Sequence, residues 1–141
     1  MTHALRTDAV APRAEIAERR LRQVFRANVL TSAVSGIVMA IAPGTVDELL
    51  GTGHSGWVRL VGLALLPFAA FVAWLSTADL RQLQLHTPGI VAGDVAWVVA
   101  SVATIAFGWY SSGGNVAVGA MALAVDVFAG LQLMFWNRIR S

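Results

Sequence analysis

The sequence predicts an all-α protein: an integral membrane four-helix bundle with an N-terminal amphipathic interfacial helix. Three observations predict this class. The chain has 141 residues, of which 57% are hydrophobic and only 13% charged, whereas an average soluble domain carries about 25% charged residues. Four apolar stretches reach the roughly 20 residues that a spanning helix needs. The arginines lie before or at the edges of these stretches, a distribution typical of membrane proteins.

The N-terminal region divides into a tail and an amphipathic segment. Residues 1–13 are polar and lack periodicity, so we expect a mobile tail followed by a single membrane domain over residues 14–141. From Ala14, helical spacing places four apolar side chains on one face and charged side chains around the rest. The apolar set is Ala17, Leu21, Val24 and Phe25. This pattern predicts a helix lying in the membrane interface, or alternatively a solvated juxtamembrane helix.

The first two spans are expected at residues 24–42 and 57–76. The first ends where Pro43 and Gly44 interrupt the helical pattern. An acidic, glycine-rich loop with one short helical turn is expected between them, over residues 43–56. Pro67 falls inside the second span, where it removes one backbone hydrogen bond and permits a kink.

The last two spans are expected at residues 89–110 and 116–136. A polar loop over residues 77–88 should precede the third span. The run from Ser111 to Asn115 is rich in serine and glycine and predicts a tight turn. Because that connection is short, the third and fourth spans should be antiparallel neighbours.

Arginine bias predicts the orientation in the membrane. Six of the ten arginines precede residue 27, and the loop with Arg81 and the C-terminal tail fall on the same side of a four-span chain. The opposite side carries Asp47 and Glu48 and only one arginine, Arg59. The positive-inside rule then places both termini in the cytoplasm.

Two carboxylates, Asp94 and Asp126, lie inside the expected spans, where an ionisable group is a candidate functional residue. At 1.5 Å per residue, Asp126 lies about 15 Å from the inner boundary, Asp94 about 9 Å, and Asn28 and Gln132 about 6 Å. We predict a partly hydrated acidic pocket that opens toward the cytoplasm. Asp94 and Asp126 would titrate as a pair, and Asn28, Trp97 and Gln132 are the other candidate site residues.

Helical spacing gives each of the four spans one face of polar or small residues, and we expect these faces to point into the bundle. In the fourth span, Asp126 shares a face with Ala122 and Ala129, and in the third Asp94 shares one with Trp97 and Ser101. Such faces are typical of helix contacts within a membrane bundle. The alternative interpretation is structural: Asp94 reaches the interface or pairs with Arg26, Asp126 hydrogen-bonds across to the first span, and Trp97 only packs.

Several functional classes find no support. The chain has no cysteine, and none of its histidines (His3, His54 and His86) lies within a span, so no thiolate chemistry and no haem site is expected. No catalytic or nucleotide-binding motif is present. We therefore expect no catalytic residue, cofactor, metal or nucleic-acid partner, and no enzymatic activity of its own. The expected partners are the lipid bilayer and either a second copy of the chain or another membrane protein.

Three short features resemble a known group. The first span closes in Ala42-Pro43-Gly44, the second opens with Arg-Leu-Val-Gly-Leu from Arg59, and the last two spans are tightly linked. In this architecture the chain resembles the small four-helix bacterial membrane proteins grouped around DoxX-like families. The resemblance implies a four-helix inner-membrane bundle and carries no site residue over to this chain.

Three functional hypotheses remain open at this point. The first is an accessory or scaffold subunit of a membrane complex without catalytic activity. The second is a small proton- or cation-linked transporter that uses Asp126 and Asp94. The third is a lipid- or quinone-binding membrane module.

Overall fold

The computed structural model describes the backbone from residue 4 and the side chains from residue 13 to the C-terminus. It confirms the all-α prediction: the described chain forms five helices and no strand. Four of them are long and apolar enough to cross a membrane. The helices are α1 (Ala4–Ile41), α2 (Pro43–Leu50), α3 (Ser55–Thr77), α4 (Leu80–Ala106) and α5 (Ser112–Arg140).

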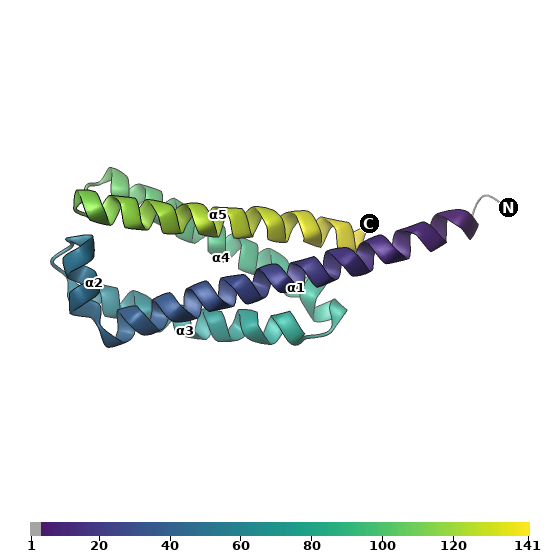
Figure 1. The fold of residues 1–141 in the computed structure, drawn as a ribbon, viewed down its shortest axis with the longest axis horizontal. Coiled ribbons are helices and arrows are strands. Elements are labelled where there is room, and N and C mark those ends of the chain that lie inside the picture. Colours follow the sequence, from purple (N-terminus) through teal and green to yellow (C-terminus); the bar gives the residue numbers. More distant parts are fainter. Residues whose placement is uncertain (1–3) are drawn as a thin grey trace.

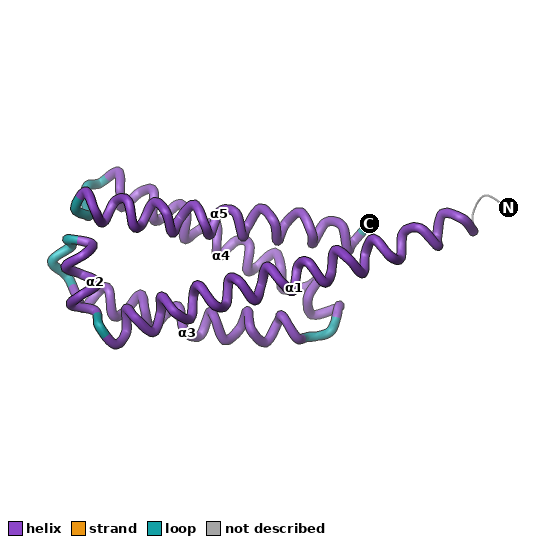
Figure 2. Tube along the Cα trace, viewed as in Figure 1, coloured by secondary structure: helices purple, strands orange, loops and turns teal. Residues whose placement is uncertain are grey.

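The long helices form an elongated bundle of two antiparallel pairs (Figure 1). Helix α1 packs along α3 and also against α5, whereas α4 packs mainly on α5 and touches α3 only slightly. The connections between the helices are short (Figure 2). The C-terminus and the α3–α4 connection lie at one end of the bundle, and α2 lies at the other. This end-to-end order is the one expected for a four-span chain.

The predicted interfacial helix is not confirmed. Helix α1 is continuous from Ala4 to Ile41, so the expected tail and amphipathic segment join the first span without a break; residues 1–3 of that tail lie outside the described residues. The apolar face of the segment is covered by protein, because Ala17, Leu21 and Phe25 are buried against the ends of the other long helices. Burial in the bundle therefore replaces burial in the membrane surface.

Helix α2 is longer than the single turn expected in the first loop. Pro43 stands in its first turn, where a missing backbone N–H costs nothing. Gly51 ends the helix in the left-handed conformation, with φ of 72°, and its N–H bonds the Asp47 carbonyl. The Thr52 hydroxyl donates to the Asp47 carboxylate and lowers the pKa of that group. These contacts make the loop an ordered cap across one end of the bundle.

The loop expected over residues 77–88 is wrong, because α4 already begins at Leu80. Asp79 caps this helix by accepting the Gln82 N–H at 2.9 Å. Pro88 lies inside α4 and cannot bond the Gln84 carbonyl four residues earlier. The indole N–H of Trp136 in α5 donates to that carbonyl instead, at 2.8 Å. A tertiary contact thus satisfies the group that the proline frees, and the helix continues.

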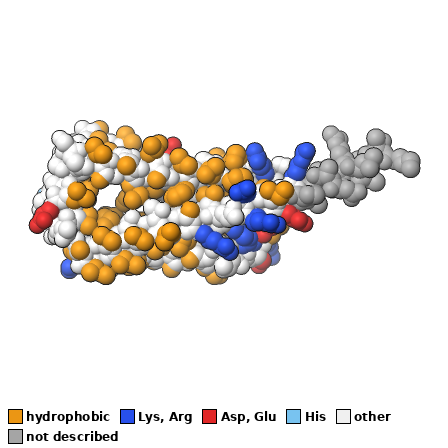
Figure 3. Space-filling model, in the orientation of Figure 1, with side chains coloured by type: hydrophobic (Ala, Val, Ile, Leu, Met, Phe, Trp, Pro, Cys, Tyr) orange, Lys and Arg blue, Asp and Glu red, His pale blue; other side chains and the backbone are white. Residues whose placement is uncertain are grey.

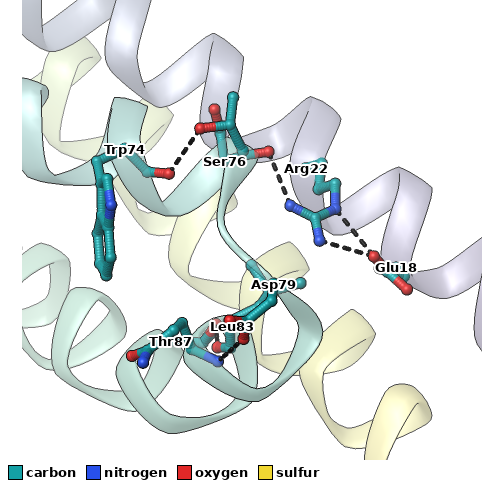
Figure 4. Close-up of polar contacts among 9 residues, drawn as sticks. Glu18, Arg22, Trp74, Ser76, Asp79, Leu83 and Thr87 are labelled. Atoms are coloured by element: carbon teal, nitrogen blue, oxygen red, sulfur yellow. Dashed lines mark hydrogen bonds and ion pairs between the residues drawn. The ribbon is translucent and has the colours of Figure 1, made fainter.

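The bundle end opposite α2 combines apolar packing with an arginine network. A buried cluster from all four long helices fills it, and its members are Ala17, Leu21, Phe25, Val72, Leu75, Leu83, Ile90 and Ile139. Beside it, Arg22 pairs with Glu18 at 2.7 Å and donates to the Ser76 carbonyl at the end of α3 (Figure 4). Basic side chains gather at this end, and the flank toward α2 is largely hydrophobic (Figure 3).

Two glycines set the closest approach of α1 and α3. A Cβ atom on Gly62 would lie 2.7 Å from the Met39 Cβ and 2.8 Å from the Ala40 backbone nitrogen. On the facing helix, a Cβ on Gly36 would lie 3.0 Å from the Gly62 carbonyl oxygen. Neither backbone has room for a side chain, so these glycines fix the spacing of the first helix pair.

Gly62→Ala should therefore destabilise the bundle by about 1–3 kcal/mol, since the new methyl group overlaps backbone atoms that cannot move independently. Thermal unfolding of the detergent-solubilised protein measures the effect. Gly89→Ala in α4 is the matched control, because a Cβ at Gly89 meets no atom within 4 Å. Equal melting temperatures for the two variants would contradict this account of the α1–α3 contact.

Candidate functional site

The most strongly organised polar group in the described chain is the carboxylate of Asp94, in the middle of α4. One of its oxygens, Oδ2, accepts the Asn28 Nδ2–H of α1 at 3.0 Å and the Gln132 Nε2–H of α5 at 2.9 Å. All three side chains are buried, with exposed fractions of 3% or less. One carboxylate therefore joins three helices at a single point.

The hydrogen bonds around Asp94 run in one direction. The Ser32 hydroxyl donates to the Asn28 Oδ1 at 3.0 Å, and Asn28 in turn donates to Asp94. Gln132 donates from the other side. Because every donor points toward the carboxylate, the cluster holds Asp94 as a hydrogen-bond acceptor.

A cavity of about 380 Å³ lies between the two helix pairs, on the α2 side of Asp94. We call it the central cavity. Its walls are mostly apolar, and Asp94 is the single ionisable residue among them. The lining residues are Thr31, Ser32, Ser35, Val38, Met39, Val46, Leu49, Leu50, Leu65, Phe68, Gly93, Asp94, Trp97, Ala117, Val118, Met121 and Val125.

Helix α2 covers the far end of the central cavity because it is docked on the start of α5. The Ser111 N–H donates to the Leu50 carbonyl at 2.9 Å. Gly114 lies directly against the same residue: a Cβ there would be 2.2 Å from the Leu50 carbonyl oxygen. A Cβ on the left-handed Gly51 would be 2.7 Å from the Ser111 Cβ. These contacts hold Leu49 and Leu50 in the cavity wall.

The structure does not bring the two predicted carboxylates together. Asp126 is exposed on the outer face of α5, and no side chain within residues 13–141 donates a hydrogen bond to it or pairs with it. The inward face of α5 instead carries Ala122, Ala129 and Gln132, which are buried. Asp126 shares a stripe with the two alanines, but it lies at the edge of that stripe and faces outward. The expected titrating pair is therefore not formed.

Asn28 and Gln132 meet at Asp94, but the cavity does not lie where the sequence placed the pocket. Asn28 and Gln132 contact Asp94 directly, and the half-buried Trp97 lines the central cavity one turn further along α4. The expected opening toward the arginine-rich end is wrong, because the buried apolar cluster fills that end. The cavity extends from Asp94 toward α2 instead.

Sequence reasoning missed most of the cavity wall. Phe68, Met121 and Val125 carry no signal that separates a cavity-lining side chain from a lipid-facing one. The part of the wall formed by α2 was also missed, because the sequence of this segment predicts a loop. Gly93 offered a weak clue: a Cβ there would meet only the Phe68 ring, at 3.6 Å, so the small residue leaves space beside Asp94.

Comparisons with known proteins give no match: no family model, no curated protein and no solved structure corresponds to this chain. The likeness to DoxX-like proteins therefore stays a prediction. Any functional assignment has to come from the geometry of the Asp94 cluster and the central cavity.

Asn28→Leu should lower the free energy of unfolding by about 1–3 kcal/mol, because it removes a donor from a buried carboxylate and leaves Ser32 without its acceptor. Asn137→Leu is the matched control: the same change on an exposed position of α5 should leave stability unchanged. Chemical denaturation in detergent micelles measures both. Equal stability of the two variants would show that the Asp94 cluster does not hold the helices together.

Proposed function

We propose that the protein is a multi-pass membrane protein that binds a small apolar or amphiphilic molecule in the central cavity and has no catalytic activity of its own. The observation that carries the proposal is the cavity itself, at about 380 Å³. Small-molecule sites have volumes of about 300–1,000 Å³ and are mostly apolar, with a few polar groups that fix the orientation of the ligand. Asp94 and Trp97 are such groups.

This proposal develops the lipid- or quinone-binding hypothesis and displaces the transporter hypothesis. A mechanism that passes a proton between Asp94 and Asp126 needs the two groups within reach of each other. Asp94 is buried among its hydrogen-bond donors, whereas Asp126 is exposed on the outer face of α5. The separation of the two groups supports binding at Asp94 alone.

The proposed setting is a bacterial inner membrane, with both termini in the cytoplasm. The gathering of arginines at the end of the bundle opposite α2 supports this orientation. Arg19, Arg20 and Arg26 are exposed on α1 at that end. In the proposed arrangement they contact lipid phosphate groups, which is the interfacial role that the amphipathic pattern of this segment predicts.

Filling the cavity should abolish binding. We choose 3-trifluoromethyl-3-phenyldiazirine as a neutral photoreactive probe that enters membranes, and mass spectrometry to map the residues that it labels. Met121 in the cavity wall should be labelled in the unmodified protein and protected in Ala117→Trp, because the indole occupies the space. Ala120→Trp, on the exposed face of α5, is the control and should leave Met121 labelling intact.

Labelling of the lipid-facing Met134, which is 38% exposed, provides an internal standard for the amount of probe in the membrane. Unlabelled Met121 in the unmodified protein, or equal Met121 labelling in both tryptophan variants, would contradict the proposed binding site.

A second function, as an accessory or scaffold subunit, is favoured by Asp126. A charged side chain facing lipid at the middle of a span costs about 2.5–3.5 kcal/mol. Another helix packed on this face would remove the cost by donating a hydrogen bond to the carboxylate. Gly130, one turn away and also exposed, would let such a helix approach closely. The partner is a second copy of the chain or another membrane protein.

Because the chain has no cysteine, a single introduced thiol reports on this face. Val127→Cys, next to Asp126, is coupled to a maleimide-linked benzophenone and should form a cross-linked species when the membranes are irradiated, because the excited ketone inserts into a C–H bond of whichever chain lies against this face. Val99→Cys, similarly exposed on α4, should remain a single chain. Cross-linking that is the same at both positions, or absent at both, would argue against docking through the Asp126 face; gel electrophoresis distinguishes these outcomes.

A further inference from the structure

We propose that the ligand of the central cavity is a small lipophilic cation, whose positive head lies against the free oxygen of Asp94 and whose apolar body extends toward α2. This inference rests on the proposed function and specifies its ligand class. Four properties of the site carry it: its surplus of acceptors, the absence of a counter-charge on the described chain, the nature of its walls and its size.

The Asp94 cluster has acceptors to spare and few donors. Both amide donors bind Oδ2, so Oδ1 of Asp94 receives no hydrogen bond from the described residues. The neighbouring Oε1 of Gln132 is buried and also has no donor among them. The hydroxyl groups of Thr31 and Ser32 are already used within α1, on the Ala27 carbonyl and on Asn28. A ligand that brings positive charge matches this site better than one that brings further acceptors.

The described chain supplies no positive charge to Asp94. The one ion pair among the described residues joins Arg22 and Glu18, and it lies at the bundle end opposite α2. The histidines among the described residues are also remote: His54 lies in the loop before α3, and His86 bonds Gln82 near the start of α4. A carboxylate held as an acceptor in an apolar bundle therefore lacks a counter-ion. A cationic ligand would provide it.

The walls of the cavity suit a cation with an apolar body. Phe68 and Trp97 line the cavity together with Asp94, and the faces of aromatic rings attract cations. The remaining walls are mainly aliphatic and favour alkyl or aryl groups. Anionic lipid headgroups would be repelled by Asp94, and a quinone carbonyl oxygen placed at Asp94 would meet another acceptor. These alternatives are less compatible with the site.

The cavity volume of about 380 Å³ limits the ligand to a compact molecule. Gly93 keeps the space next to Asp94 open, so that a substituted ammonium group can approach the carboxylate. A single aromatic ring joined to a quaternary or protonated nitrogen has the required combination of size, charge and apolar surface.

The test compares two competitors of equal shape in the Met121 photolabelling experiment. Benzyltrimethylammonium carries the positive charge, and neopentylbenzene is its neutral carbon analogue. In Asp94→Asn, the cation concentration that halves Met121 labelling should rise by about tenfold or more, because the charge–charge contact is lost. The value for the neutral analogue should stay within about twofold, since only apolar contacts hold it.

Glu48→Gln is the charge-matched control, because it removes a carboxylate from the exposed side of α2. It should leave unchanged the concentration at which each competitor halves Met121 labelling. The unmodified protein gives a second measurement that requires no variant. At equal concentrations in the lipid phase, determined by partitioning, the cation should protect Met121 more strongly than its neutral analogue. This comparison decides the proposal if Asp94→Asn does not fold.

The outcomes separate the ligand class from the binding function. Equal protection by both competitors in the unmodified protein, or an equal effect of Asp94→Asn on both, would overturn the cation while leaving the cavity as a binding site. Labelling of Met121 that neither competitor reduces, and that Ala117→Trp does not abolish, would overturn the proposed function as well.

Discussion

One carboxylate oxygen of Asp94 accepts two amide hydrogen bonds, and the rest of this bundle depends on that contact. A polar group buried among apolar helices has to find its partners inside the protein. Asn28 and Gln132 supply them from α1 and α5. Each helix has one rotation about its axis that points its polar side chain at the same spot, so this contact sets which faces of α1, α4 and α5 turn inward. The faces that line the central cavity follow from that choice.

The two ends of the bundle are closed by different physical means, and the cavity is what remains between them. At the arginine-rich end, large apolar side chains from all four long helices interlock around Phe25 and Leu83. At the other end, backbone contacts of Gly114 and Ser111 with Leu50 hold α2 across the gap between the helix pairs. Small residues thus bring backbones together at this end, and the side chains behind them line the central cavity without filling it.

The aspartates of α4 and α5 are chemically alike but differ in surroundings, which gives them different proposed roles. Asp94 has its donors within the chain and faces a cavity of ligand size, so its proposed contribution is to the binding of a small molecule. Asp126 has no partner within residues 13–141 and faces outward, so its proposed contribution is to the docking of another helix. Both proposals follow from one rule: a carboxylate in an apolar setting is stable only where a partner satisfies it.

The sequence by itself determined the helical class, the four helices long and apolar enough to cross a membrane, and the similar position of Asn28, Asp94 and Gln132 along the bundle, because hydropathy and the rise per residue act along the chain. It misplaced the start of α4, since Pro88 ends a helix unless a remote group such as the Trp136 indole takes up the freed carbonyl. It also predicted wrongly that Asp126 faces inward, because helical spacing shows which residues share a face but does not show where that face points. Only the tertiary structure decided that direction, since the rotation of a helix depends on the side chains that its neighbours offer.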